Sequence, residues 1–327
     1  MTRVRIAALA GGIGAARFLR GLKAELAARG TADEITVIGN TADDVTLFGL
    51  RICPDLDTVM YTLGGGINEE QGWGRAEETF AVKGELAAYD VEPQWFGLGD
   101  RDFATHIVRS QMLALGYPLS QVTEALCARW QPGVRLLPMS DDPVETHVVV
   151  EDDQGRRAVH FQEWWVRMHA ATPALSIVAI GAEQARPAPG VLEAIAGAEL
   201  LLLPPSNPVV SIGTILAGPG IRDALVAAHA PVVGVSPIIG GAPVRGMADA
   251  CLASIGVETT ARAVAEHYTG LIDGWLVDTR DEADLAGGAV TGVEVRALAL
   301  LMSDETATRA IAAAALDLGA ELRARRP

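Results

Sequence analysis

The chain has 327 residues, of which 50% are hydrophobic and 20% charged, and its formal net charge is −15. This composition is ordinary for a globular protein of one large or two smaller domains, and no apolar run approaches the roughly 18 residues of a membrane span. The acidic charge argues against nucleic acid as a partner, because phosphate contacts need clustered Lys and Arg.

The cysteines are few and far apart: Cys53, Cys127 and Cys251. Their odd number and the absence of a C-x-x-C pair argue against a disulfide framework or a cysteine zinc site. A reducing cytoplasm is therefore the expected location.

The first 40 residues predict a βαβ unit. Residues 4–10 are apolar and predict a buried strand, the glycines of 11–14 form a turn, 15–30 have helical spacing, and 34–40 predict a second strand. Further strands are expected at 175–181, 199–203, 231–237, 274–279 and 292–300, with helices at 190–198 and 221–230 between them. Alternating strands and helices are typical of a parallel sheet.

The middle of the chain has a different pattern. After a helix at 119–130, the apolar segments 133–139 and 144–150 and a turn at 151–155 indicate antiparallel strands. We therefore predict an α/β fold, a doubly wound, mostly parallel Rossmann-like sheet with a mixed α+β insertion. Residues 1–327 form one compact unit, with a core of about 1–64 and 173–327 and an insertion of about 65–172.

The glycine turn "AGGIGAAR" follows a strand and opens a helix. Gly12 and Gly14 partly fit a dinucleotide fingerprint, but Arg17 occupies the third glycine position and no Gly-Lys-Ser/Thr follows. Two interpretations stay open: backbone N–H groups that bind a phosphate at the helix N-terminus, or a tight strand–helix turn.

Adjacent carboxylates, Asp43 and Asp44, lie in "NTADD" directly after the second strand. Ligands of open α/β sheets bind at that end of the strands. The pair is either a solvated turn or a site for Mg²⁺, which prefers one or two carboxylates plus substrate phosphates. Asp55 or Asp57 of "CPDLDT" could complete such a site or accept a proton.

Two Pro/Gly/Ser loops, "PPSNPVVSIG" and "SPIIGGAPVRG", follow consecutive predicted strands. Asn207 suits a purine edge, and a rigid loop loses little entropy on binding. "GLGDRD", which contains Asp100, is either an acidic turn or part of a site. We interpret His106, His147, His160 and His169 as structural, and the Trp164–Trp165 pair as packing.

Together these stretches resemble the 2-phospho-L-lactate transferases of coenzyme F-420 biosynthesis, in particular the actinobacterial branch. The resemblance covers nearly the whole chain, through an ordered set of motifs: "AGGIGAARFLRGL", "NTADD", "CPDLDTVMYTLGGG", "WFGLGDRDFATHIVRSQML", "LLPMSDDPVETHV", "VHFQEWW", "PPSNPVVSIGTIL" and "VSPIIGGAPVRGMADACL".

The resemblance implies transfer of a phosphoenolpyruvyl or 2-phospho-L-lactyl group from a guanosine diphospho-ester to the terminal ribityl hydroxyl of the deazaflavin Fo, with release of GMP. It implies Mg²⁺ as cofactor and a homodimer. It assigns metal binding to Asp43, Asp44 and Asp57, and catalysis to Asp57 and Asp44. The remaining ligand-binding residues that it implies are Gly11, Gly12, Gly14, Asn40, Thr41, Asp57, Asp100, Ser206, Asn207 and Ser211.

One departure concerns the acceptor side, where other branches have a Lys and this chain has Gly97. Arg75 or Arg101 could supply the positive charge instead. The alternative function is a non-catalytic regulator with the same core that binds nucleotide sugars. The sequence does not separate the two three-carbon donors.

Overall fold

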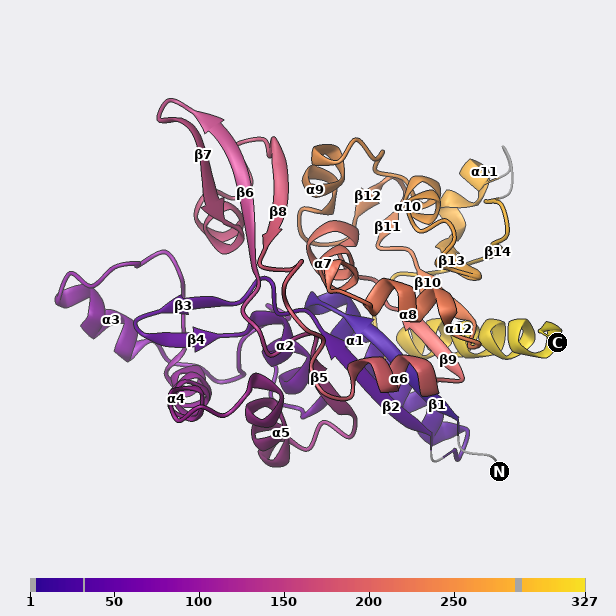
Figure 1. Ribbon diagram of the computed structural model, residues 1–327, viewed down its shortest axis with the longest axis horizontal. Coiled ribbons are helices and arrows are strands. Elements are labelled where there is room, and N and C mark those ends of the chain that lie inside the picture. The colour runs from indigo at the N-terminus through magenta and orange to yellow at the C-terminus, as the bar shows by residue number, and fades with distance from the viewer. Residues whose placement is uncertain (1–3, 32, 286–289, 327) are drawn as a thin grey trace.

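The computed structural model describes residues 4–31, 33–285 and 290–326. Its centre is a seven-stranded sheet in the order β14-β13-β10-β9-β1-β2-β5 (Figure 1), in which each neighbouring pair is parallel. The strands are β1 (Arg5–Ala10), β2 (Glu34–Gly39), β5 (Arg135–Pro138), β9 (Leu200–Leu203), β10 (Val232–Val235), β13 (Gly274–Asp278) and β14 (Glu294–Leu298). The predicted doubly wound α/β fold is confirmed.

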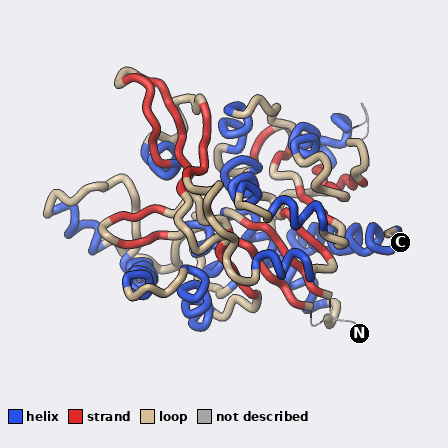
Figure 2. The backbone as a smooth tube through the Cα atoms, in the orientation of Figure 1, coloured by secondary structure: helices blue, strands red, loops and turns tan. Residues whose placement is uncertain are grey.

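Helices cover both faces of this sheet (Figure 2). Successive side chains of a strand point to opposite faces, so Ile6 and Ala8 of β1 join one apolar cluster and Ala7 and Leu9 join the other. The first cluster includes α1 (Gly12–Ala28), α2 (Pro54–Leu63), α5 (Leu119–Trp130) and α12 (Glu305–Arg325). The second includes α6 (Val191–Gly197), α7 (Thr214–Ala217), α8 (Ile221–Ala227), α9 (Ala248–Ser254) and α10 (Ala261–His267).

The strand order changes direction at β1. From there the chain adds β2 and β5 on one side, then returns to add β9, β10, β13 and β14 on the other. The switch point of the sheet therefore lies between β1 and β9, and in α/β proteins ligands bind at the carboxyl ends of the strands at this place.

Smaller elements extend from the core. β6 (Glu145–Asp152), β7 (Gly155–His160) and β8 (Ser176–Ile180) form an antiparallel sheet, at the top of Figure 1, and β3 (Val45–Leu47) pairs with β4 (Leu50–Ile52) at the left. The others are β11 (Ile238–Ile239), β12 (Ala242–Pro243), α3 (Ala81–Ala88), α4 (Asp100–Ala114), α11 (Glu282–Leu285), the π-helices η1 (Glu163–Arg167) and η2 (Pro208–Gly213), and the 3-10 helix η3 (Thr279–Asp281).

The division between core and insertion differs from the prediction in two strands. β5, expected in the insertion, is an edge strand of the central sheet, and β8, expected in the core, pairs with β6. Val178 and Ile180 of β8 are 49% and 52% exposed, which no strand of a covered parallel sheet would allow. The boundaries 65 and 172 therefore do not separate two folding units.

Within the described ranges, no single helix is both long and apolar enough to cross a membrane. One bent pair, Pro208–Ala217 with Ile221–Ala227 at 87°, meets the criteria of length and composition.

Candidate active site

Three of the predicted motifs lie side by side at the carboxyl ends of the strands around β1. The glycine turn follows β1, "NTADD" follows β2 and the Pro/Ser/Asn loop follows β9. These strands are neighbours in the sheet, so the three loops leave from the same edge. The fold thus brings the three predicted segments together, and their role as a binding site stays a prediction.

The glycines of the first loop permit close packing. A Cβ atom on Gly11 would lie 2.5 Å from Cβ of Ser211, and one on Gly14 would lie 2.3 Å from the carbonyl oxygen of Pro205. Both distances are shorter than any real contact. The glycines let the start of α1 lie directly against the loop that follows β9.

The backbone N–H groups of this loop already have partners. Gly11 donates to Ser206 Oγ at 3.4 Å, and Gly12 donates to Asp55 Oδ1 at 2.9 Å. The carboxylate of Asp55 thus occupies the N-terminus of α1, where a phosphate was expected. The tight-turn interpretation accounts for these contacts, and phosphate binding by the glycines stays a prediction.

Both the amide nitrogen and the amide oxygen of Asn40 have hydrogen-bond partners within the protein. Its Nδ2 donates to Asp55 Oδ2 at 2.9 Å and to the carbonyl of Val210 at 3.1 Å, while its Oδ1 accepts from Ala42 N and Thr214 Oγ1. Burial raises the pKa of Asp55 to about 6, although hydrogen bonds from Asn40 and the glycine turn lower it. Asn40 thus connects the loops after β2 and β9, rather than presenting a free amide.

The acidic loop is different, because several of its buried side-chain oxygens have no hydrogen-bond partner. Asp43 is 5% exposed and Asp44 is 0% exposed. Neither oxygen of Asp44 has a hydrogen-bond partner, nor do Asp43 Oδ1, Thr41 Oγ1 and Thr146 Oγ1. Arg51 Nη2 lies 3.4 Å from Asp44 Oδ2 as an ion pair. Buried carboxylate oxygens without hydrogen bonds cost free energy, and the ion pair with Arg51 offsets this cost only for Asp44.

The titration of both groups follows from that burial. Burial raises the pKa of Asp44 to about 7 against the opposing charge of Arg51. Burial, and then the charge of Asp55, raises the pKa of Asp43 well above its usual value. A cation at these oxygens would hold both groups ionised.

The unpartnered carboxylate oxygens are of the ligand type that a divalent cation takes. Mg²⁺ is bound by one or two carboxylates and takes its other ligands from substrate phosphates and water. Among the residues that the structure describes, no group of three or more His, Cys, Asp or Glu side chains is placed to hold a metal. Asp43, Asp44 and Asp57 are therefore not gathered as one ligand set, and the role of Asp57 as a ligand stays a prediction.

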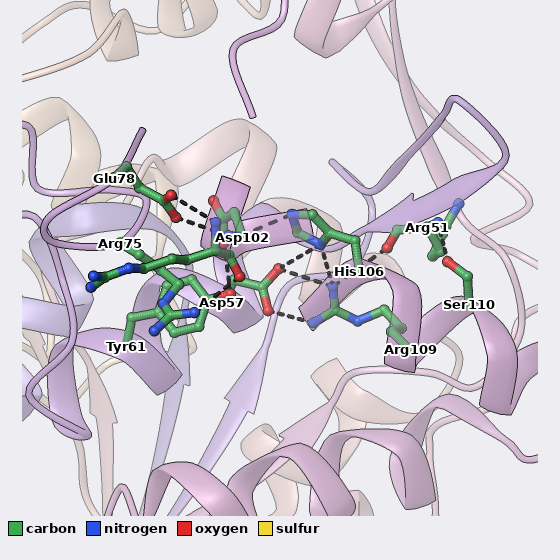
Figure 3. Close-up of polar contacts among 10 residues, drawn as sticks. Arg51, Asp57, Tyr61, Arg75, Glu78, Asp102, His106, Arg109 and Ser110 are labelled. Atoms are coloured by element: carbon green, nitrogen blue, oxygen red, sulfur yellow. Dashed lines mark hydrogen bonds and ion pairs between the residues drawn. The ribbon is translucent and has the colours of Figure 1, made fainter. Parts of the chain in front are cut away.

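Asp57 is instead held by a buried arginine (Figure 3). Both carboxylate oxygens accept from the guanidinium of Arg109, with Nη1 3.0 Å from Oδ2. Arg109 is 1% exposed. Burial lowers the pKa of Arg109, but the charge and hydrogen bonds of Asp57, together with other nearby groups, raise it further, so that the net shift is upward. Asp57 thus lies in the structure as one half of a buried ion pair.

A histidine and a carboxyl extend this pair. Arg109 Nη1 donates to Nδ1 of His106 at 3.1 Å, while Nε2 of His106 has no hydrogen bond and lies 3.8 Å from Asp102 Oδ1. Tyr61 donates to the same oxygen at 2.7 Å. Burial lowers the pKa of His106 to about 4, and burial with the charge of Asp57 raises that of Asp102 to about 7.

The sequence missed most of this network. Asp57 and Tyr61 are four residues apart in α2, and Asp102, His106 and Arg109 are spaced for one face of α4. That spacing was a usable signal. The pairing of α2 with α4 was not predictable, because the two helices come together only in the fold.

Other predicted residues have structural contacts. Asp100 accepts from the N–H groups of Ala81 and Val82 and so caps α3. Asn207 accepts from Val209 and Val210 at the start of η2. The ligand-binding roles of these two residues stay predictions.

The positive charge nearest to Gly97 comes from Lys83 of α3. A Cβ atom at Gly97 would lie 3.7 Å from Nζ of Lys83. Arg75 instead donates to the backbone carbonyl of Arg101, and the side chain of Arg101 forms an ion pair with Glu77. Lys83 also lines an apolar pocket with Phe48, Phe96 and Phe103.

Fold and site together define an α/β protein with a buried acidic loop at its topological switch point. The profile of the family "2-phospho-L-lactate transferase CofD" matches residues 6–298. The chain belongs to this family, and it is a transferase.

Relatives agree with this assignment. A "Phosphoenolpyruvate transferase" from Thermobifida fusca (strain YX) is 71% identical over 327 residues, covering 98% of this chain and 100% of the relative. One of the same name from Kitasatospora aureofaciens is 69% identical, covering 98% and 99%. The crystal structure of a UPF0052 family protein from Bacillus halodurans, 17% identical, has the same fold, with a TM-score of 0.63 over 97% of this chain and 99% of that one.

Proposed function

We propose that the chain transfers a phosphoenolpyruvyl group from a guanosine diphospho-ester to the terminal ribityl hydroxyl of Fo, releasing GMP, in coenzyme F-420 biosynthesis. The name shared by the actinobacterial relatives favours phosphoenolpyruvyl over 2-phospho-L-lactyl as the transferred group. The family supports the class of reaction.

The observation that carries the proposal is the set of unpartnered carboxylate oxygens of Asp43 and Asp44 at the switch point. A protein of net charge −15 repels a diphosphate unless a cation intervenes. We propose that Asp43 and Asp44 hold Mg²⁺, which would neutralise charge on the donor phosphates.

The chain's own groups then position the two substrates. In the proposed reaction, the Fo hydroxyl oxygen forms a bond to the phosphorus that carries the three-carbon acid, the bond from that phosphorus to GMP breaks, GMP leaves with the electron pair, and the hydroxyl proton passes to solvent. Such transfers depend mainly on positioning and charge stabilisation. Because both Asp57 oxygens already accept from Arg109, we assign Asp57 the task of orienting the acceptor rather than of removing its proton.

The guanosine end is assigned to the loop after β9. Ser206 and Ser211 are buried beside the glycine turn, and Asn207 fixes the start of η2. This loop is held rigid by its own hydrogen bonds, which lowers the entropy lost on nucleotide binding.

The test is direct product detection. The purified chain is incubated with Fo, Mg²⁺ and the guanosine diphospho-ester of phosphoenolpyruvate. The products are separated by chromatography and identified by mass spectrometry. The proposal predicts one product that carries Fo and the phosphoenolpyruvyl group, and one equivalent of GMP. Stable substrates under these conditions would contradict it.

A further inference from the structure

The antiparallel β6–β7–β8 sheet holds the backbone of the acidic loop. Three successive carbonyl groups of residues 42–44 each accept a hydrogen bond from this sheet or from the residues that follow β7. The bonds are Thr146 N to Ala42 O at 2.6 Å, Gln162 Nε2 to Asp43 O at 3.1 Å, and His160 Nε2 to Asp44 O at 3.2 Å.

The donor atom of His160 is fixed by a second contact. The backbone N–H of Gln162 donates to Nδ1 of His160 at 3.1 Å, so Nδ1 accepts and the proton is on Nε2. Nε2 then points at the carbonyl of Asp44. Trp164, which is fully buried and donates to the carbonyl of Thr172, anchors the segment after Gln162.

This arrangement orders the loop without using its carboxylates. Gln162 and His160 bind only the main chain of Asp43 and Asp44, and Asp43 Oδ1 and both oxygens of Asp44 stay without hydrogen bonds. Two adjacent buried carboxylates repel one another, so the loop needs another source of order before a cation arrives. Hydrogen bonds to its carbonyl groups supply that order.

We propose that Gln162 and His160 are positioning residues, which aim the carboxylates of Asp43 and Asp44 at the bound cation. The inference rests on the proposed function, because the cation is part of it. It gives the "VHFQEWW" segment a role in the site, and it makes the β6–β7–β8 sheet part of the active site rather than an appendage. His160, interpreted from the sequence as structural, acts through the main chain of the loop.

The test measures cation binding and not turnover. Mn²⁺ is titrated into the chain, with and without GDP, and free Mn²⁺ is followed by electron paramagnetic resonance. Gln162→Met and His160→Leu remove one donor each, and we expect Mn²⁺ to bind about tenfold or more weakly, as for other residues that orient metal ligands. His160→Gln keeps an N–H near the Nε2 position and should bind Mn²⁺ nearly as the wild type does.

The matched control is Arg156→Gln, an exposed position on β7 of the same sheet. It should leave Mn²⁺ binding unchanged, and thermal unfolding verifies that each variant is folded. If Gln162→Met does not fold, Gln162→Asn replaces it, since the shorter side chain withdraws the amide from Asp43 O, and the same weakening is expected.

Two results would overturn the inference. One is wild-type Mn²⁺ affinity in the folded variants that lack a donor, and the other is a wild-type chain that binds no Mn²⁺ under either condition. A chain that binds Mn²⁺ with the predicted ranking but transfers nothing to Fo would support the inference and count against the proposed function.

Discussion

The burial of Asp43 and Asp44 lowers the stability of this fold. Their carboxylates are buried with oxygens that accept no hydrogen bond, and burial raises the pKa of Asp44 to about 7. Neighbouring polar groups such as Asn40 and Asp55 are, in contrast, fully engaged with the protein. Asn40 and Asp55 thus hold the loops together, whereas the oxygens of Asp43 and Asp44 are available to a ligand.

Asp44→Asn should therefore raise the stability of the protein and lower its activity. Without added metal at pH 8, the amide removes a buried charge, and we expect the free energy of unfolding to rise by about 1–2 kcal/mol. Turnover with Mg²⁺ should fall at least about tenfold, because one cation ligand is lost. Asp153→Asn, in an exposed turn, is the control. A destabilised Asp44→Asn with normal turnover would contradict this account.

Asp57→Asn should reduce both activity and stability. It leaves Arg109 buried without its counter-charge, and breaking a buried pair in this way costs about 3–5 kcal/mol. The double variant Asp57→Asn/Arg109→Gln removes both charges and should recover much of the stability, while turnover stays at least about tenfold below wild type. Denaturant unfolding and steady-state kinetics measure the two effects. Unchanged stability in Asp57→Asn would show that the ion pair contributes nothing.

At the scale of elements, the sequence predicted what depends on local pattern. The strand "EITVIG" is found as expected, and the predicted helix at 15–30 is found as Gly12–Ala28, because the apolar spacing of both is strong. The start was misplaced, since Gly12 and Gly14 of the predicted turn belong to the helix. β5 and β8 are both short apolar runs, and periodicity alone does not reveal which sheet a short strand joins. Arg109 was missed for a similar reason, since its partner Asp57 is 52 residues away.

α3 carries the cation that the motif at Gly97 lacks. If Lys83 serves the acceptor side, Lys83→Met should weaken Fo binding about tenfold, the loss of one charge-assisted hydrogen bond. Adding Gly97→Lys to that variant should restore binding, because a side chain at Gly97 starts 3.7 Å from Nζ of Lys83. Glu85→Gln, exposed on the same helix, is the control. Normal Fo binding by Lys83→Met would remove Lys83 from the acceptor site.

At the scale of the whole molecule, the insertion and the core form one structure. β5 completes the central sheet, the β6–β7–β8 sheet contacts the acidic loop, and α4 binds α2 through Arg109. Segments that are far apart in the sequence thus bring buried ionisable groups together. The free energy of unfolding should therefore change with pH as these groups titrate.

Asp102 gives the clearest pH dependence. Its pKa is about 7 in the fold and near 3.8 as a free group, so the folded state holds its proton more tightly than the unfolded state. This contribution to stability is greatest below pH 4 and is lost as the pH rises to about 7. Asp102→Asn removes the titration, so its stability relative to wild type should rise by up to about 4 kcal/mol between pH 4 and pH 8. A difference independent of pH in denaturant unfolding would contradict the assignment.

The central claim is that donor and acceptor meet at a cation held by Asp43 and Asp44 at the switch point beside β1. It is tested most directly by a fluorescence titration of the purified chain with Fo, in the presence and absence of GDP and Mg²⁺. The account predicts saturable Fo binding that GDP and Mg²⁺ together strengthen. No binding of Fo under either condition, with GDP or a nucleotide sugar still bound, would contradict it and favour a nucleotide-sugar-binding regulator.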